Sequence, residues 1–341
     1  MLKLYLSDIL LFSGENFFQA PEFFHIKLYH SCFYHPTILK SFNLKAKLFI
    51  EIIICIVYNN NIKKSIGDEK ILEIGVLINL DNEIENRFVQ AYELGFKSCQ
   101  LCCWDKKLMT AEMAERVNSC CKKYEIKISS FWCGWSGPAV WDFYEGPLTL
   151  GLVPAEYRLQ RMKDLKCGSD FAKLINVRNV ATHMGFLPEV PETEQYRSLV
   201  AAIKNVASYM KDNGQKFLFE TGQETPVTLR RTIEDVGTGN LGINLDPANL
   251  ILYGKANPVD ALDVFGEYVC DVHAKDGCYP TNGRDLGEEK PLGEGKVNFP
   301  ALVAKLKAVG YNGPLTIERE ISGEQQIKDI KSAKKLLEGL I

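Results

Sequence analysis

Four side chains able to bind a metal ion stand directly after short apolar runs in the C-terminal half of the chain: Glu220, Asp246, His273 and Glu318. Three carboxylates and one imidazole suit Mn²⁺, Mg²⁺, Co²⁺ or Zn²⁺, and the oxygen-rich set favours the harder ions. Any one of them alone is more simply a solvated loop residue, and Asp246, which precedes Pro247, could simply start a turn. Four such positions in succession instead predict a site for one divalent metal ion.

Two glutamates beside a metal suit proton transfer next to a carbonyl group. The metal would bind the carbonyl and hydroxyl oxygens of an α-hydroxyketone and stabilise the enediolate formed on loss of the carbon-bound proton. One carboxylate removes that proton and the other returns a proton on the opposite face, with partial desolvation adjusting both pKa values. We therefore predict Glu220 and Glu318 as the acid and base, a role that Asp246 and His273 do not share.

Further residues near strand ends are candidates for substrate binding: His183, Lys275, Trp104, Asn249 and Glu320. Lys275 lies two residues after His273, hence on the same side, where it can bind a hydroxyl, carboxylate or phosphate group. A hydrogen-bonded structural role for His183 stays open. For the tryptophans, plain packing is an equal alternative to stacking on a sugar face.

These side chains need elements that bring them to one place. The expected strands are 71–79, 98–102, 127–133, 177–183, 216–220, 241–245, 268–273 and 315–318. The expected helices are 83–94, 111–124, 157–174, 194–211, 226–236, 258–265, 300–309 and 324–340. Eight strand–helix pairs in about 270 residues predict an α/β fold, a (β/α)₈ TIM barrel whose strands all end at one mouth.

An open, doubly wound sheet is the alternative fold. It would need a glycine-rich turn after the first strand, whereas residues 79–82 read Asn-Leu-Asp-Asn. Two stretches, 134–154 and 275–298, exceed ordinary connections. Because long loops in compact domains usually serve function, we expect both at the catalytic face of the barrel.

Residues 1–69 differ from the rest of the chain. Phe, Ile, Leu, Lys, Asn and Tyr dominate, and the apolar residues form clumps without helical or strand periodicity. The apolar run 48–58 is too short to cross a bilayer, which needs roughly 20 residues. We interpret 1–69 as an atypical extension, either an accessory element, a poorly ordered segment or translated upstream sequence, and 70–341 as the barrel.

Bulk composition narrows the range of partners. A net charge of -3 without strong clustering argues against a nucleic-acid partner, and no membrane span is expected. Eleven cysteines, an odd number with adjacent pairs, indicate a reducing, cytoplasmic compartment instead of a disulfide framework. Cys99 and Cys102 form a CxxC pair, which we interpret as ordinary buried thiols. Whether the chain forms a homo-oligomer stays open.

Five segments of the chain together resemble a known family. They are Phe219-Glu220, 244–249 (Asn-Leu-Asp-Pro-Ala-Asn), 272–277 (Val-His-Ala-Lys-Asp-Gly), 291–299 (beginning Pro-Leu-Gly-Glu-Gly) and 316–320 (Thr-Ile-Glu-Arg-Glu). The stretch from about residue 71 to 341 resembles the xylose-isomerase-like TIM-barrel superfamily, in particular its sugar phosphate isomerase/epimerase group. The resemblance implies that Glu220, Asp246, His273 and Glu318 bind the metal. It also implies that Glu220 and Glu318 are the acid/base pair, as in the ketose 3-epimerases.

Three functions follow as expectations. The first is a metal-dependent isomerase or epimerase of a small keto sugar or sugar derivative. The second is a dehydratase of an inosose-like or 3-keto sugar, since the group contains inosose dehydratase and hydroxypyruvate isomerase. The third is an abasic-site endonuclease, because endonuclease IV shares this barrel with a three-metal cluster. Asn249 stands where a histidine is common in the family and no His-x-His follows His273, which disfavours the third function and also the tagatose- or allulose-type 3-epimerases.

Overall fold

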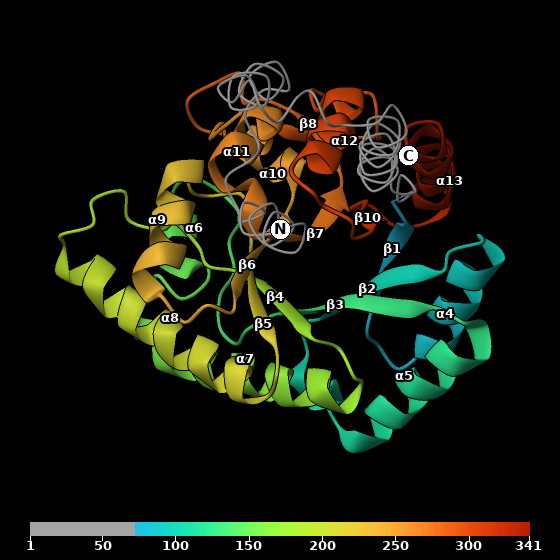
Figure 1. Ribbon diagram of the computed structural model, residues 1–341, viewed down its shortest axis with the longest axis horizontal. Coiled ribbons are helices and arrows are strands. Elements are labelled where there is room, and N and C mark those ends of the chain that lie inside the picture. The colour runs from blue at the N-terminus through green and yellow to red at the C-terminus, as the bar shows by residue number, and fades with distance from the viewer. Residues whose placement is uncertain (1–71) are drawn as a thin grey trace, which may run out of the picture. The chain divides into compact units, whose positions relative to one another are not determined.

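The barrel is formed by eight parallel strands surrounded by helices (Figure 1). The computed structural model describes residues 72–341, and residues 70–341 form one compact unit. The predicted extension 1–69 lies outside the described residues. The strands close in the order β1-β10-β7-β6-β5-β4-β3-β2, and each pairs in parallel with its neighbours. The predicted (β/α)₈ TIM barrel is confirmed.

The strands lie where the sequence pattern places them. Those of the barrel are β1 (Ile74–Asn79), β2 (Ser98–Cys103), β3 (Lys127–Cys133), β4 (Asn179–His183), β5 (Lys216–Glu220), β6 (Leu241–Leu245), β7 (Val269–Ala274) and β10 (Leu315–Ile317). A separate antiparallel hairpin, β8 (Asp276–Cys278) with β9 (Glu288–Lys290), occupies the segment after β7. That segment is the second of the two long stretches expected at the mouth.

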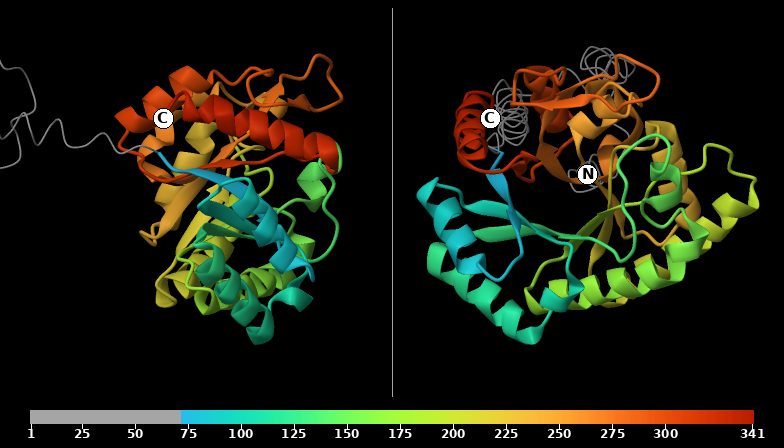
Figure 2. Two further views of the ribbon diagram at one scale, coloured as in Figure 1. Left: turned by 90° about the vertical axis from the view of Figure 1, so that its right-hand side faces the viewer. Right: turned by 180° about the vertical axis from the view of Figure 1, so that it is seen from behind.

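The principal helices lie around the outside of the strands in all three views (Figures 1 and 2). They are α4 (Ile84–Glu93), α5 (Ala111–Tyr124), α7 (Ala155–Leu174), α8 (Glu194–Asp212), α9 (Pro226–Val236), α11 (Pro258–Phe265), α12 (Phe299–Ala308) and α13 (Glu324–Glu338). Two short helices, α6 (Gly146–Thr149) and α10 (Pro247–Leu252), lie in connections that follow strands. Within residues 72–341, no helix combines the length and apolar character that a bilayer crossing requires.

Local chemistry sets where several of these helices begin. The side chains of Thr110 and Thr193 accept hydrogen bonds from the backbone amides of Met113 and Tyr196, which caps α5 and α8. Asn298 caps α12 in the same way by accepting from Ala301. Each cap satisfies an amide that has no partner inside its helix, so the strand–helix connection ends at a defined residue.

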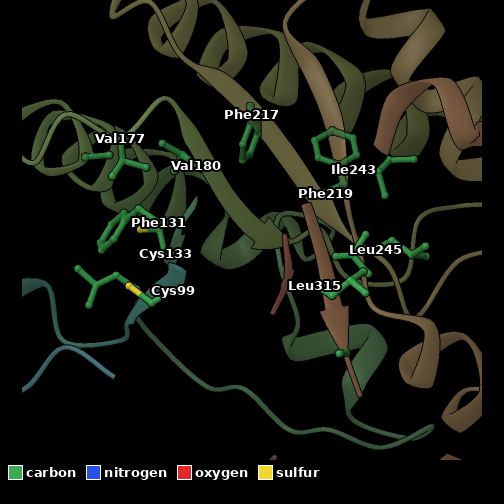
Figure 3. Packing of buried hydrophobic residues seen from close by; sticks show 14 of the residues in the cluster. Cys99, Phe131, Cys133, Val177, Val180, Phe217, Phe219, Ile243, Leu245 and Leu315 are labelled. Carbon is green, nitrogen blue, oxygen red and sulfur yellow. The ribbon is translucent and has the colours of Figure 1, made fainter. Parts of the chain in front are cut away.

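The alternation of side chains along β5 shows how the barrel divides its core. Phe217 and Phe219 belong to the large cluster packed between strands and helices, together with Ile243 and Leu245 of β6 (Figure 3). Leu218 belongs to a second cluster drawn from β2 to β5 and the loop after β3. Because successive strand residues point to opposite faces, Glu220 shares the inward face with Leu218. The strand that fills the core therefore also aims a carboxylate into the mouth.

Candidate active site

Four metal-capable side chains converge at the mouth: Glu220, Asp246, His273 and Glu318. Each offers one ligand atom, and these atoms all lie within 4.8 Å of one another. Glu220 ends β5, Asp246 follows β6, His273 belongs to β7 and Glu318 follows β10. In the barrel, β7 lies between β6 and β10, which brings residues far apart in the sequence onto adjacent strands.

Asp246 illustrates how the backbone fixes a candidate ligand. Its Oδ1 accepts a hydrogen bond from the Asn249 amide at 2.9 Å and thereby caps α10. Its own amide and carbonyl both bond to the Thr221 hydroxyl at 2.8 Å. With one carboxylate oxygen committed, only Oδ2 remains to face the cluster. The turn-starting role and the ligand role that the sequence left as alternatives therefore use different oxygens of one carboxylate.

Three of the atoms facing the centre of the cluster have no hydrogen-bond partner. They are Oδ2 of Asp246, Nδ1 of His273 and Oε2 of Glu318, and all three are buried. Nδ1 of His273 lies 2.9 Å from Oε2 of Glu318, but the two do not meet with hydrogen-bond geometry. Buried polar atoms without partners are costly and usually mark a bound group. One divalent cation would satisfy all three, so the residues fit a metal of the predicted type.

The other ring nitrogen of His273, Nε2, contacts two carboxamides inside the barrel. Nε2 lies 2.8 Å from Oε1 of Gln100 on β2 and 3.2 Å from Nδ2 of Asn244 on β6. Gln100 in turn donates through its own Nε2 to Oδ1 of Asn244 at 3.0 Å. When Nδ1 of His273 binds a metal, Nε2 carries the ring proton, and Gln100 is placed to accept it. Sequence reasoning missed both carboxamides.

Electrostatics holds the cluster together without a metal. Burial lowers the pKa of His273, but Glu318 and Glu220 outweigh this and raise that pKa well above its usual range. Burial raises the pKa of Glu220, yet His183 and His273 hold that pKa well below normal. Burial also acts to raise the pKa of Glu318, which Lys275 and His273 lower. Glu220 and Glu318 are therefore ionised carboxylates that face protonated partners.

Lys275 is buried, and three carboxylates lie close to its ammonium group. Its Nζ lies 2.7 Å from Glu320, 3.4 Å from Asp246 and 3.5 Å from Glu318. It also donates to Oδ1 of Asn249 at 3.4 Å. Burial lowers the pKa of Lys275, but these carboxylates raise it well above its ordinary value. The structure thus places three of the predicted substrate-binding residues, Lys275, Asn249 and Glu320, in one network beside the metal-capable cluster.

Glu220 receives three polar contacts besides His273. The indole Nε1 of Trp132 donates to Oε2, Nε2 of His183 lies 3.3 Å from Oε1, and Nδ2 of Asn249 lies 3.5 Å from Oε1. His183 sits opposite Glu220 in the pairing of β4 with β5. Trp132 of β3 and His183 of β4 position the carboxylate from the side away from β6 and β7, whereas Asn249 belongs to α10, which follows β6. Trp132 was not among the predicted site residues.

The four tryptophans of the chain form one aromatic wall: Trp104, Trp132, Trp135 and Trp141. Trp104 packs 4.9 Å from Trp132 and 5.3 Å from Trp135, measured between ring centres, and remains 44% exposed. Trp141, from the long connection after β3, lies 4.9 Å from the His183 ring. The loop 134–154 therefore reaches the mouth as expected, and Trp104 both packs and presents surface.

A second group of buried polar atoms without partners adjoins this wall. It comprises Nε1 of Trp135, Nδ1 of His183, both amide atoms of Gln223 and the hydroxyl of Tyr253. Glu224, next to Gln223, is also buried, and burial raises its pKa to about 7. Gln223 and Glu224 lie beyond the end of the fifth strand in a stretch without periodicity, so the strand-end pattern gave no signal for them.

The CxxC cysteines are ordinary members of the second strand. Cys99 and Cys102 are both free and buried on β2. Burial raises the pKa of each thiol well above its usual value, which disfavours the reactive thiolate. These properties agree with the interpretation of ordinary buried thiols.

The glycine-rich segment after β9 wraps around a buried carboxylate. The Asp276 side chain accepts hydrogen bonds from the backbone amides of Gly293, Gly295 and Val297 at 2.9 to 3.0 Å, and from Gly277 at 2.8 Å. A ring of backbone amides of this kind can bind an anion. Here the chain's own carboxylate fills it, so the segment is a structural support for the loop that follows β7.

Replacing Gly295 with Ala should destabilise this loop. An added Cβ would lie 2.1 Å from Oδ1 of Asp276 and 2.5 Å from the Gly277 amide nitrogen, too close for either to stay in place. We expect a loss of about 1–3 kcal/mol in the free energy of unfolding, measured by chemical denaturation. Gly283→Ala is the matched control, because a Cβ there meets nothing within 4 Å. Equal stability of both variants would contradict this account.

Comparison with known proteins gives a consistent result. A family model described as xylose isomerase-like TIM barrel matches residues 88–340. The crystal structure of a xylose isomerase domain protein from Planctomyces limnophilus is 36% identical, with a TM-score of 0.74, and the match covers 79% of this chain and 97% of that one. An uncharacterized protein of Methanocaldococcus jannaschii is 29% identical over 169 residues, which are 46% of this chain and 54% of that protein. The match thus spans about half the length of that curated relative.

Two more distant solved structures share the fold. A 3-keto-D-glucoside 4-epimerase from E. coli is 18% identical with a TM-score of 0.59, over 79% of this chain and 99% of that one. A xylose isomerase-like TIM barrel protein from Mycobacterium smegmatis, in complex with magnesium, is 16% identical with a TM-score of 0.59. The match covers 80% of this chain and 97% of that one. At these identities the likeness concerns the fold alone.

Proposed function

The chain belongs to the xylose isomerase-like TIM barrel family, and on this premise we propose that it is a metal-dependent isomerase or epimerase of a small keto sugar or sugar derivative. The observation that carries the proposal is the cluster of Glu220, Asp246, His273 and Glu318, with three buried ligand atoms lacking partners. A glutamate stands at each side of this cluster, as proton transfer at a carbon beside a carbonyl requires.

A divalent ion held by the four residues would supply Lewis acidity toward the carbonyl oxygen and neighbouring hydroxyl of an α-hydroxyketone. The solved structure from Mycobacterium smegmatis, a complex with magnesium, supports an ion of the hard class. Within residues 72–341, this is the one group of three or more such side chains able to hold a metal. A single-ion site favours sugar chemistry over the three-metal chemistry of an abasic-site endonuclease.

Glu220 and Glu318 carry the proton transfers in this proposal. Both carboxylates are ionised near neutral pH because charged partners lower their pKa values. One ionised carboxylate would accept the carbon-bound proton. The other would first take up a proton, from water or from a substrate hydroxyl, and then return it to the enediolate form of the substrate on the opposite face. Trp132 donates a hydrogen bond to Glu220, and Nε2 of His183 lies 3.3 Å from that carboxylate. Charged groups of Lys275 and His273 lie 3.5 and 2.9 Å from Oε2 of Glu318. These contacts fix each carboxylate in the orientation that proton transfer needs.

The proposal is tested by proton exchange from carbon in D₂O. The full chain, loaded with Mn²⁺, is incubated with ketoses, keto acids and 3-keto sugars, and exchange is followed by NMR. We expect exchange with at least one sugar and its loss on addition of a chelator. Net loss of water from the product would identify a dehydratase instead. Absence of exchange across the panel by metal-loaded protein would overturn the proposed function, and salt-dependent binding to abasic DNA would revive the nuclease.

Metal affinity should rise with pH, because His273 must lose a proton before Nδ1 can bind an ion. The raised pKa of His273 keeps the ring protonated through neutral pH in the metal-free protein. Below that pKa, each ion bound releases one proton, and the dissociation constant falls about tenfold per pH unit. Glu220 and Glu318, with lowered pKa values, release none in this range.

Calorimetric titration of Mn²⁺ in two buffers of different ionisation enthalpy counts the protons released. We expect close to one at about pH 6–7. His183→Asn is the control, because His183 also has a raised pKa from Glu220, against the lowering effect of its burial, but is no ligand. That variant should release the same number. Proton-independent binding would contradict the role of His273.

A further inference from the structure

Gln223 is a buried carboxamide whose hydrogen bonds are incomplete, although it lies close enough to the Tyr253 hydroxyl to act against the rise that burial causes in the pKa of that phenol. It is 1% exposed, and neither Nε2 nor Oε1 is hydrogen-bonded. The Tyr253 hydroxyl, on a side chain 6% exposed, is in the same condition. Leaving an amide and a phenol unpaired in the interior destabilises the fold. Such residues persist where a ligand completes their hydrogen bonds, because function and stability then oppose each other.

Both side chains flank the metal-capable cluster. Gln223 follows Glu220 by three residues, and Tyr253 comes directly after α10, the helix that Asp246 caps. The Tyr253 ring packs where Gly222 has no side chain, since a Cβ there would lie 3.6 Å from it. Ring centres of Phe143 and Phe186 lie 6.1 and 5.8 Å from that of Tyr253. The Tyr253 hydroxyl therefore lies near Gln223, Lys275 and Glu320, while its ring packs against aromatic residues of the loops after β3 and β4.

The charges around this pair indicate what it binds. Lys275, Glu320 and Glu224 all lie near the Tyr253 hydroxyl, but the charge of Lys275 is already paired with three carboxylates. Lys255 faces Glu224 and lies over the Phe186 ring, 5.9 Å from its centre. A phosphate dianion would meet carboxyl groups in this setting. A hydroxyl group, in contrast, can donate to and accept from a carboxamide or a phenol.

We propose that Gln223 and Tyr253 form a subsite for uncharged hydroxyl groups of the substrate, away from the carbon that exchanges its proton. The assignment rests on the proposed function and narrows its substrate class to sugars without a phosphate at that end. The aromatic rings of Phe143 and Phe186 supply the apolar surface that the carbon chain of such a sugar contacts. Glu224, whose pKa burial raises to about 7, adds a carboxyl group able to donate a hydrogen bond.

Gln223→Leu and Tyr253→Phe test this subsite, with two matched controls. Gln215 is also buried, but both ends of its carboxamide are hydrogen-bonded. Its Oε1 accepts a hydrogen bond from the Ser169 hydroxyl, and its Nε2 donates to the Ser169 carbonyl at 2.9 Å. Tyr311 is buried and donates its hydroxyl to the Pro314 carbonyl. Removing an unpaired group should leave the melting temperature at or above that of the wild type, whereas Gln215→Leu and Tyr311→Phe should lower it. A lower melting temperature for Gln223→Leu, comparable to Gln215→Leu, would show a structural role and overturn the subsite.

Kinetics provide the second readout. For the best sugar of the exchange panel, each subsite variant should raise KM about tenfold with a smaller change in kcat, and the controls should leave KM unchanged. D-fructose, 6-deoxy-D-fructose and D-fructose 6-phosphate are included, and we expect the phosphate ester to be the poorest. Unchanged KM in both variants, or preference for the ester, overturns the subsite alone. Absence of exchange by the metal-loaded wild type overturns the proposed function instead.

Discussion

Glu318→Gln should reduce proton exchange from the substrate carbon by about 10³-fold at saturating Mn²⁺ while the barrel stays folded. The amide has the size of the carboxylate but cannot accept the proton, and it is a weaker metal ligand. Lys275 keeps its contacts with Asp246 and Glu320, so no buried charge is left alone. The measurement is the exchange rate in D₂O, together with circular dichroism and the melting temperature.

Glu115→Gln is the control for this prediction. Glu115 is exposed on α5, a helix that carries none of the four residues of the cluster. It should exchange at the wild-type rate. Exchange by Glu318→Gln within a few-fold of the wild type would remove Glu318 from the acid/base pair. Metal binding, titrated separately, distinguishes a lost base from a lost ligand.

Gln100→Leu should weaken Mn²⁺ binding about 10- to 100-fold. The carboxamide Oε1 lies 2.8 Å from Nε2 of His273 and accepts the proton that this nitrogen must carry when Nδ1 binds the metal. Without the acceptor, the buried N–H has no partner, since Asn244 presents its own Nδ2 to the same nitrogen. The dissociation constant is measured by electron paramagnetic resonance of free Mn²⁺.

A conservative variant separates positioning from packing. Gln100→Glu keeps an acceptor for His273 and should bind Mn²⁺ within a few-fold of the wild type, whereas Gln100→Leu should not. The buried Gln215→Leu, distant from the mouth, controls for general loss of stability and should retain the wild-type affinity. Equal weakening by Gln100→Leu and Gln100→Glu would mean that Gln100 acts through packing alone.

Periodicity was sufficient to predict the elements with the clearest patterns. Strands β3, β5 and β6 and helices α5, α9 and α11 have the predicted bounds residue for residue. Helix α10 was missed because its six residues, Pro-Ala-Asn-Leu-Ile-Leu, are too few to show a helical period. The β8–β9 hairpin was missed because its strands have three residues each, and Glu288–Lys290 is entirely charged.

The strand-end pattern was also sufficient to select the residues that the fold brings within one cluster, although their roles as ligands and as acid and base remain predictions. It could not find Gln100 and Asn244, because a polar residue facing the barrel interior looks in sequence like one facing solvent. Gln223 and Tyr253 were missed for another reason: their significance lies in hydrogen bonds that the chain does not supply. Missing hydrogen bonds can be recognised only when the neighbours of each atom in the folded protein are known.

On the proposed function, the buried Lys275 and the protonated His273 have a consequence for the order of folding and metal binding. They offset part of the negative charge of the carboxylates at the mouth, so the barrel would be able to fold before it binds an ion. The ion would then displace a single proton, that of His273, from a site whose side chains are already in place. Metal binding would then be a late and reversible step, set by the supply of metal and not by the synthesis of the chain, and a protein stripped of its ion could bind another without unfolding.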